Sequence, residues 1–195
     1  MLAVEKRLTS ILLVPTSVET VMEVDRHIGA AMSGLTADAR TLIEKARIDA
    51  QMHRFTYDEP MKCESIAQAI CDMALNFGED KKEGGNPMSR PFGVALLLAG
   101  FDKTGASLYH TDPSGTYVHY EAKAIGSGSE GAQKSLEDAW HANMTLLEAQ
   151  KLALEILKQV MEEKISSTNV EVATVTASGY KVLNKTELAA AVSQL

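Results

Sequence analysis

The sequence has few cysteines, and this scarcity excludes a disulfide-stabilised protein. Only Cys63 and Cys71 occur among 195 residues. Both belong to one predicted helix, where eight residues separate them by about 12 Å, which is too far for a disulfide. The N-terminus also lacks the apolar core of a signal peptide. Free thiols and no export signal together indicate a reducing compartment.

Long apolar runs and basic clusters are also absent. The longest apolar run, Val94 to Ala99, is far shorter than the roughly 20 residues that cross a bilayer. The net charge is −7 and no stretch is rich in lysine and arginine. We therefore expect neither a membrane nor a nucleic acid as partner. The remaining composition, 45% hydrophobic and 23% charged, is that of one ordinary globular domain spanning residues 1–195.

Motifs of common enzymes and metal sites are missing as well. There is no HExxH, no cluster of cysteine and histidine, and no G-x-S-x-G nucleophile elbow. The five histidines are scattered, and only His110 and His119, on the two sides of a predicted hairpin, are placed to face each other. Two ligands do not make a zinc site. We therefore expect no metal, no cofactor and structural cysteines.

The spacing of apolar residues predicts an α+β fold. Strands are expected at 2–7, 21–24, 28–33, 92–99, 107–111, 116–122, 170–175 and 180–183, and helices at 36–50, 66–77, 132–140, 145–164 and from 186. A solvated loop is expected at 79–86. The helices come mainly in pairs, which disfavours alternating parallel strands and favours two antiparallel sheets packed face to face with helices outside. The apolar strand 92–99 suits burial on both faces.

The stretch AIGSGSEGAQ (124–133) contains the G-x-G-x-x-G pattern of dinucleotide sites. In a dinucleotide site the first strand, the glycine loop, the helix and the next strand together span about 30 residues. Here two helices separate the glycines from the next strand. Ser127 and Glu130 have the spacing of a capping box at a helix start. We interpret the glycines as a turn from strand to helix, with nucleotide binding as the weaker alternative.

Seven segments along nearly the whole chain resemble the α subunits of the 20S proteasome. They are LAVEKR (2–7), VDRHIGAAMSGLTADARTLIEKAR (24–47), RFTYDEP (54–60), MSRPFGVALLLAG (88–100), DPSGTY (112–117), KAIGSGSEGAQ (123–133) and LKQVMEEK (157–164). The most distinctive are SRPFGVALL and AIGSGSEGAQ.

The resemblance implies the four-layer α/β/β/α sandwich of N-terminal-nucleophile hydrolases. It also implies a seven-membered ring of α subunits that stacks on the catalytic β ring, controls substrate access and docks activator particles in ubiquitin-dependent protein degradation. The implied partners are therefore other α subunits, β subunits and activators. The implied location is the cytoplasm and the nucleus.

The resemblance further implies that the chain is not a protease. Catalytic relatives use an N-terminal threonine whose amine acts as base, with an acid and a lysine nearby. Glu5 aligns with the acid, Arg7 follows with matching spacing, and Thr20 stands at the lysine position. In α subunits that lysine lines a pocket for activator tails. Thr20 donates a hydrogen bond but carries no charge, so we expect weaker tail docking there.

Compared with the family, this sequence lacks the leading gate tail, first helix and first strand. We therefore expect the strand at 2–7 to have an unpaired edge, and gating and part of ring assembly to depend on the missing segment. One alternative function remains open in the same fold, an amide hydrolase processed to a new N-terminal nucleophile. Thr9 and Ser10 are the nearest candidates for it.

Overall fold

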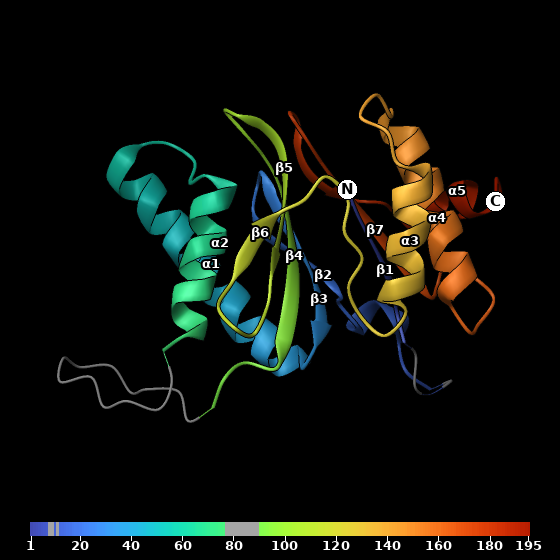
Figure 1. The fold of residues 1–195 in the computed structure, drawn as a ribbon, viewed down its shortest axis with the longest axis horizontal. Helices are drawn as coiled ribbons and strands as arrows, with labels where there is room; N and C mark the ends of the chain where they lie inside the picture. The colour runs from blue at the N-terminus through green and yellow to red at the C-terminus, as the bar shows by residue number, and fades with distance from the viewer. Residues whose placement is uncertain (8–9, 11, 77–89) are drawn as a thin grey trace.

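The computed structural model describes residues 1–7, 10, 12–76 and 90–195. The expected loop at 79–86 and the candidate nucleophile Thr9 lie outside the described residues. Within them the chain forms two antiparallel sheets with helices on both outer faces (Figure 1).

The larger sheet has five strands in the order β2-β3-β4-β5-β6. Its strands are β2 (Val21–Asp25), β3 (Ile28–Gly34), β4 (Val94–Asp102), β5 (Gly105–Thr111) and β6 (Tyr117–His119). The smaller sheet has three strands in the order β1-β7-β8. They are β1 (Leu2–Glu5), β7 (Val170–Thr176) and β8 (Gly179–Val182). β1 is thus an edge strand in the described part of the chain.

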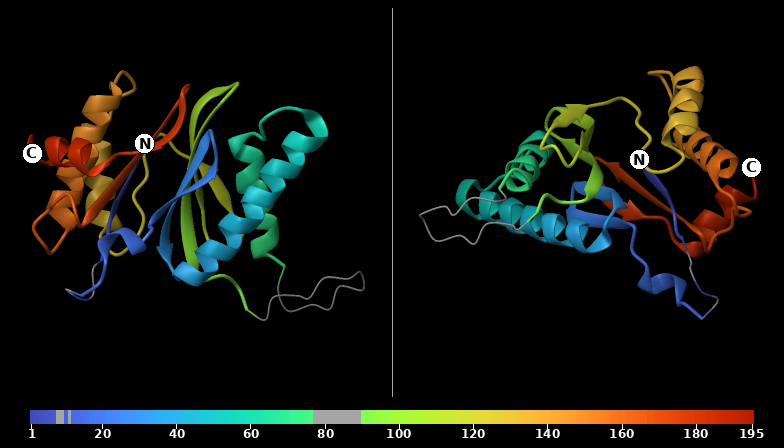
Figure 2. Two further views of the ribbon diagram at one scale, coloured as in Figure 1. Left: turned by 180° about the vertical axis from the view of Figure 1, so that it is seen from behind. Right: turned by 60° about the horizontal axis from the view of Figure 1, so that its bottom comes forward.

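The helices divide between the two outer faces. Helices α1 (Thr36–Tyr57) and α2 (Cys63–Ala74) cover the five-stranded sheet, whereas α3 (Ser129–Ala139), α4 (Leu146–Val160) and α5 (Lys185–Val192) lie on the side of the three-stranded sheet. A short 3₁₀ turn, η1 (Pro15–Ser17), precedes β2. Both views of Figure 2 show the same separation, with the teal helices and the orange and red helices at opposite ends. The predicted four-layer sandwich is confirmed.

Three hydrophobic clusters fill the three spaces between the four layers. β4 shows why its sequence is apolar throughout. Leu96 and Leu98 pack toward α1 and α2, and the alternate residues Leu97 and Ala99 pack toward the other sheet. A third cluster, which includes Leu154 of α4 and Val172 of β7, joins the three-stranded sheet to its helices. The prediction that the strand at β4 is buried on both faces is confirmed.

Several predicted boundaries differ from those in the structure. The second helix ends at Ala74 rather than near residue 77, and β6 has three residues rather than seven. α3 ends at Ala139, so Trp140 caps it in an extended conformation with 39% of its surface exposed. α4 ends at Val160 rather than near Lys164. Each difference moves an element's end and leaves its type and order unchanged.

Candidate functional site

Thr20, the one site residue predicted from sequence, lies directly before β2 and contacts the other sheet. Its backbone N and its Oγ1 both donate to Oε2 of Glu171 in β7, at 3.2 and 3.0 Å. The backbone N of Val21 donates to the same oxygen at 3.3 Å. Thr20 therefore helps to fasten the start of β2 to β7.

Lys6 completes this cluster from the end of β1. Its Nζ lies 3.1 Å from Oε1 of Glu171, and both side chains are mostly buried. The carboxylate of Glu171 thus accepts from three neutral donors on one oxygen and faces an ammonium on the other. A largely buried carboxylate that accepts from this many donors is suited to hold strands together.

The other two aligned residues are not brought to Thr20. Glu5 Oε1 lies 3.9 Å from Nε of Arg7, in an ion pair that is partly exposed. Glu5 and Arg7 thus pair with each other, while Lys6 between them reaches Glu171. The sequence interpretation missed Glu171 and Lys6. Its one available signal was the acidic residue inside the apolar strand VEVATVT.

Tyr180 of β8 lies near Glu171 and two further acidic side chains. Burial, together with the negative charges of Glu171, Glu23 and Glu19, raises the pKa of the Tyr180 phenol to about 12. Its hydroxyl is buried without a hydrogen-bond partner among the described residues. The phenol therefore stays neutral at physiological pH.

The glycine stretch forms a turn before α3, and the predicted capping box is wrong. Gly126 has φ +103°, in the region that favours glycine. The helix begins at Ser129 with Gly128 as N-cap, so Ser127 lies outside it and caps nothing. Instead Gln133 of α3 accepts from the backbone N of Ala124 at 3.0 Å. The chain bends sharply and is held by its own helix.

His110 and His119 do not face each other across the hairpin. In the β5–β6 ladder His110 stands opposite Val118, and His119 stands opposite Tyr109. Adjacent positions on a strand face opposite sides, so the two imidazoles lie on different faces. Among the described residues no group of acidic, cysteine or histidine side chains is arranged to hold a metal ion.

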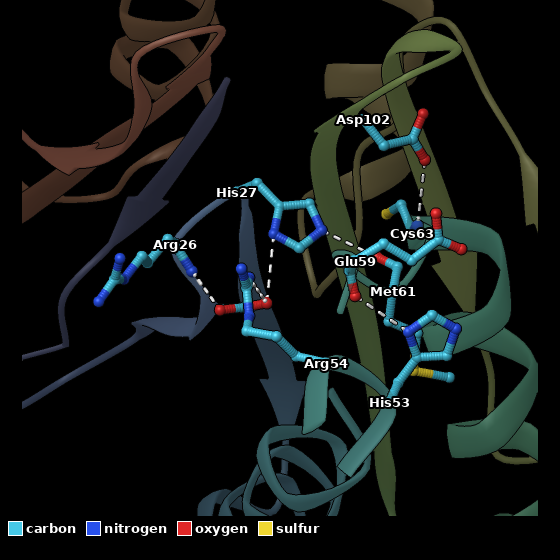
Figure 3. Close-up of polar contacts among 9 residues, drawn as sticks. Arg26, His27, His53, Arg54, Glu59, Met61, Cys63 and Asp102 are labelled. Atoms are coloured by element: carbon cyan, nitrogen blue, oxygen red, sulfur yellow. Dashed lines mark hydrogen bonds and ion pairs between the residues drawn. The ribbon is translucent and has the colours of Figure 1, made fainter. Parts of the chain in front are cut away.

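A second polar cluster fixes the connection between α1 and α2 (Figure 3). Asp25 is buried, and its Oδ2 accepts from Nη2 of Arg54 at 2.8 Å while its Oδ1 accepts from the backbone N of Arg26 at 2.8 Å. His27 Nδ1 lies 3.3 Å from the same Oδ2, and His27 Nε2 lies 2.8 Å from the carbonyl oxygen of Met61. The β2–β3 turn is thereby tied to the end of α1 and to the start of α2.

Both cysteines are buried in this part of the fold and are free. Burial raises the pKa of the Cys63 thiol to about 12 and that of the Cys71 thiol to about 11. Protonated, buried thiols are poor nucleophiles. The cysteines therefore serve the packing of α2, as expected.

Comparison with known proteins now gives the family. The family model described as proteasome subunit matches residues 1–175. The chain belongs to the proteasome subunit family. It is 57% identical to the proteasome subunit alpha type-5 of Dictyostelium discoideum over 196 aligned residues, which cover 100% of this chain and 81% of that protein.

Two further relatives carry the same subunit type. The chain is 59% identical to the probable proteasome subunit alpha type-5 of Schizosaccharomyces pombe, covering 99% of this chain and 78% of that protein. It is 58% identical to the proteasome subunit alpha type-5 of Drosophila melanogaster, covering 90% of this chain and 72% of that protein. The identity is thus high along nearly the whole chain.

In this proteasome subunit the RPFG part (90–93) of the distinctive segment SRPFGVALL has a structural role. Arg90 donates from Nη1 and Nη2 to the two oxygens of Asp38 in the first turn of α1, at 2.7 and 2.9 Å, and the backbone N of Gly93 donates to Asp38 at 2.8 Å. Phe92 between them is buried. A bidentate arginine–carboxylate pair fixes orientation as well as distance. The segment therefore locks the start of β4 to the start of α1.

Proposed function

We infer that this chain is a non-catalytic subunit of the α ring of the 20S proteasome core particle. The observation that carries the inference is the identity of 57% and 59% to proteins named proteasome subunit alpha type-5, spread over at least 99% of the chain. Such a subunit acts through its surfaces. Its partners are the neighbouring α subunits and the β subunits, and its process is ubiquitin-dependent protein degradation.

The alternative of a processed amide hydrolase conflicts with the position of β1. Ser10 follows this strand, and cleavage before it would remove β1 from the smaller sheet. β1 pairs with β7 along its whole length, and Leu2 is 2% exposed in the core between the sheets. Releasing a nucleophile at Ser10 would therefore cost the fold a core strand.

Assembly in the complete particle tests the inferred function. The chain would be co-expressed with the other α and β subunits and the products separated on native gels. We expect the chain to migrate with the assembled core and to hydrolyse no peptide alone. Recovery only as a free monomer, with the core assembling without it, would contradict the function.

We also propose that Thr20 weakens activator docking at this subunit. The support is that Thr20 replaces the lysine of the family resemblance, and that its hydroxyl is already engaged by Glu171. A hydrogen bond from a charged donor contributes about 1.5–3 kcal/mol where a neutral one contributes about 1. We expect Thr20→Lys to tighten binding of a peptide with an activator's C-terminal carboxylate by roughly tenfold.

Fluorescence anisotropy of the labelled peptide on assembled particles measures this affinity. The control is the same peptide with an amidated C-terminus, which should gain nothing from the lysine. Equal affinity of the free-carboxylate peptide for both particles would refute the Thr20 proposal while leaving the subunit assignment intact.

We further propose that the subunit works in the cytoplasm and the nucleus. The support is that both cysteines are free and buried, as suits a reducing compartment. Imaging of a fluorescent fusion that is incorporated into particles tests the location.

A further inference from the structure

A cleft of about 470 Å³ opens beside the β2–β3 turn, and arginines dominate its lining. The residues that line it come from the end of β2, the turn and the second half of α1. They are Glu23, Val24, Asp25, Arg26, Arg47, Gln51 and Arg54. The cleft is thus a local basic site in a chain whose net charge is −7.

Two of the three arginines, Arg26 and Arg47, make no ion pair within the described residues. Arg54 is committed to buried Asp25. Arg47 donates Nε to the carbonyl oxygen of Glu23 at 2.7 Å, which fixes the side chain and leaves its terminal nitrogens available. In the part of the chain that the structure describes, neither Arg26 nor Arg47 has a carboxylate within ion-pair distance. The three arginines and the two acidic residues of the lining, Glu23 and Asp25, together give the cleft a net charge of +1.

An exposed apolar stripe runs along α1 next to these arginines. Ile48, Met52 and Phe55 follow one another at helical spacing and are 52%, 60% and 89% exposed. Each of the three directly follows in sequence a residue of α1 that lines the cleft. These lining residues are Arg47, Gln51 and Arg54. Large apolar side chains gathered on one exposed face mark a protein contact.

We propose that this cleft receives an aspartate or glutamate side chain of a neighbouring subunit, whose apolar residues cover Ile48, Met52 and Phe55. The inference rests on the proposed function, because it requires an assembled partner. A guanidinium group pairs with a carboxylate through two parallel hydrogen bonds, which fixes the partner's orientation. A free phosphate would satisfy the arginines and leave the adjacent apolar stripe in water, so a protein segment fits both features.

Cross-linking through a substituted lysine tests the contact without removing the charge. Arg26→Lys and Arg47→Lys each place an amine in the cleft, and a carbodiimide then joins that amine to a touching carboxylate. Applied to the assembled particle, we expect cross-linked peptides that connect position 26 or 47 to an acidic residue of another subunit. Arg40→Lys, on the same helix about 10 Å before Arg47 and outside the cleft lining, is the control and should give none.

Charge reversal supplies the second measurement. We expect Arg47→Glu to reduce incorporation into the assembled core at least fivefold in competition with the unmodified chain, and Arg40→Glu to leave it unchanged. Equal incorporation of both variants, or cross-links from position 47 only to this chain's own Glu23, would overturn the proposal. So would stabilisation of the free chain by inorganic phosphate with no cross-link between subunits. Failure of the unmodified chain to incorporate would instead refute the proposed function.

Discussion

At the residue scale, Asp25 is a buried charged side chain that ties the β2–β3 turn to α1. Burial raises the pKa of its carboxyl, but the hydrogen bond from Arg54, the backbone N of Arg26 and the nearby His27 together outweigh burial and hold that pKa below its usual value. The carboxylate is thus charged at neutral pH and surrounded by donors.

Replacing Asp25 by asparagine turns one of its two acceptors into a donor, which then faces either Arg54 or the backbone N–H of Arg26. We expect Asp25→Asn to lower the free energy of unfolding by about 2–3 kcal/mol, because the hydrogen bonds lost involve charged groups in a buried position. Urea unfolding followed by circular dichroism measures this. Asp49→Asn, which breaks the exposed Lys45–Asp49 pair, should cost less than about 0.5 kcal/mol. Equal costs for the two variants would show that Asp25 is not a structural anchor.

Acid should destabilise the chain through Asp38 as well as Asp25. The hydrogen bond from Arg90 and the backbone N of Gly93 hold the pKa of Asp38 below its usual value. A folded-state pKa below the unfolded one gives stability that is present above about pH 4 and is lost as pH falls through the folded pKa. We expect the urea midpoint to hold steady from pH 7 to about pH 5 and to fall below about pH 4. The urea midpoint of Asp38→Asn should be lower at pH 7 and should fall less steeply as the pH decreases. Parallel curves for the variant and the unmodified chain would refute this role of Asp38.

At the element scale, the glycines before α3 have different structural roles, which a pair of variants can separate. Gly126 has a positive φ, and an added Cβ would lie 3.2 Å from Ser33 Oγ, whereas a Cβ at Gly131 meets nothing within 4 Å. We expect Gly126→Ala to destabilise by about 1–2 kcal/mol through backbone strain. Gly131→Ala should stabilise α3 by about 0.5–1 kcal/mol. Thermal unfolding of both variants measures the difference, and destabilisation by Gly131→Ala would contradict the turn interpretation.

The ends of the helices show what local sequence predicts and what it does not. A helix was predicted from residue 145, and Thr145 caps it in the structure, since Thr145 accepts from the backbone N of Glu148 and the Glu148 side chain accepts from Thr145. The similar spacing of Ser127 and Glu130 failed, because a glycine with positive φ delays the start of α3 until Ser129. A capping pattern is thus reliable only where the backbone before it is free to adopt the cap.

The end of α4 depends on tertiary packing. An α-helix continued to Lys164 would place Glu162 and Glu163 at its negative end, which is unfavourable. Instead the helix stops at Val160, and Met161 and Ile165 turn into the core beneath the smaller sheet. The helical spacing of apolar residues in the sequence continues beyond Val160. Burial of Met161 in the core nevertheless ends the helix there.

At the scale of the whole molecule, the sequence predicts the layers but not the contacts between them. The period of each element and the pairing of the helices are local properties, and they were sufficient for the order of strands, helix pairs and sheets. The contact of Thr20 with Glu171 joins residues 151 positions apart, and no local pattern encodes it. The same holds for the arginine cleft, which combines a turn with a helix that starts ten residues later.

The packing of one sheet on the other depends on Gly29 and Tyr180. A Cβ at Gly29 of β3 would lie 2.5 Å from the ring of Tyr180 in β8, so an alanine there must push the sheets apart. We expect Gly29→Ala to destabilise by about 2 kcal/mol through overpacking. Tyr180→Phe keeps the ring and removes a buried hydroxyl that has no partner among the described residues, so it should raise stability by about 0.5–1 kcal/mol.

Urea unfolding of Gly29→Ala, Tyr180→Phe and the double variant measures both effects and their coupling. Because phenylalanine fills the same space against Gly29, the cost of the alanine should be the same in either background. A loss of stability on Tyr180→Phe would mean that the hydroxyl is bonded, through water, to the carboxylates that surround it. The fit between the sheets would then depend on a polar contact at Tyr180 as well as on the absence of a side chain at Gly29.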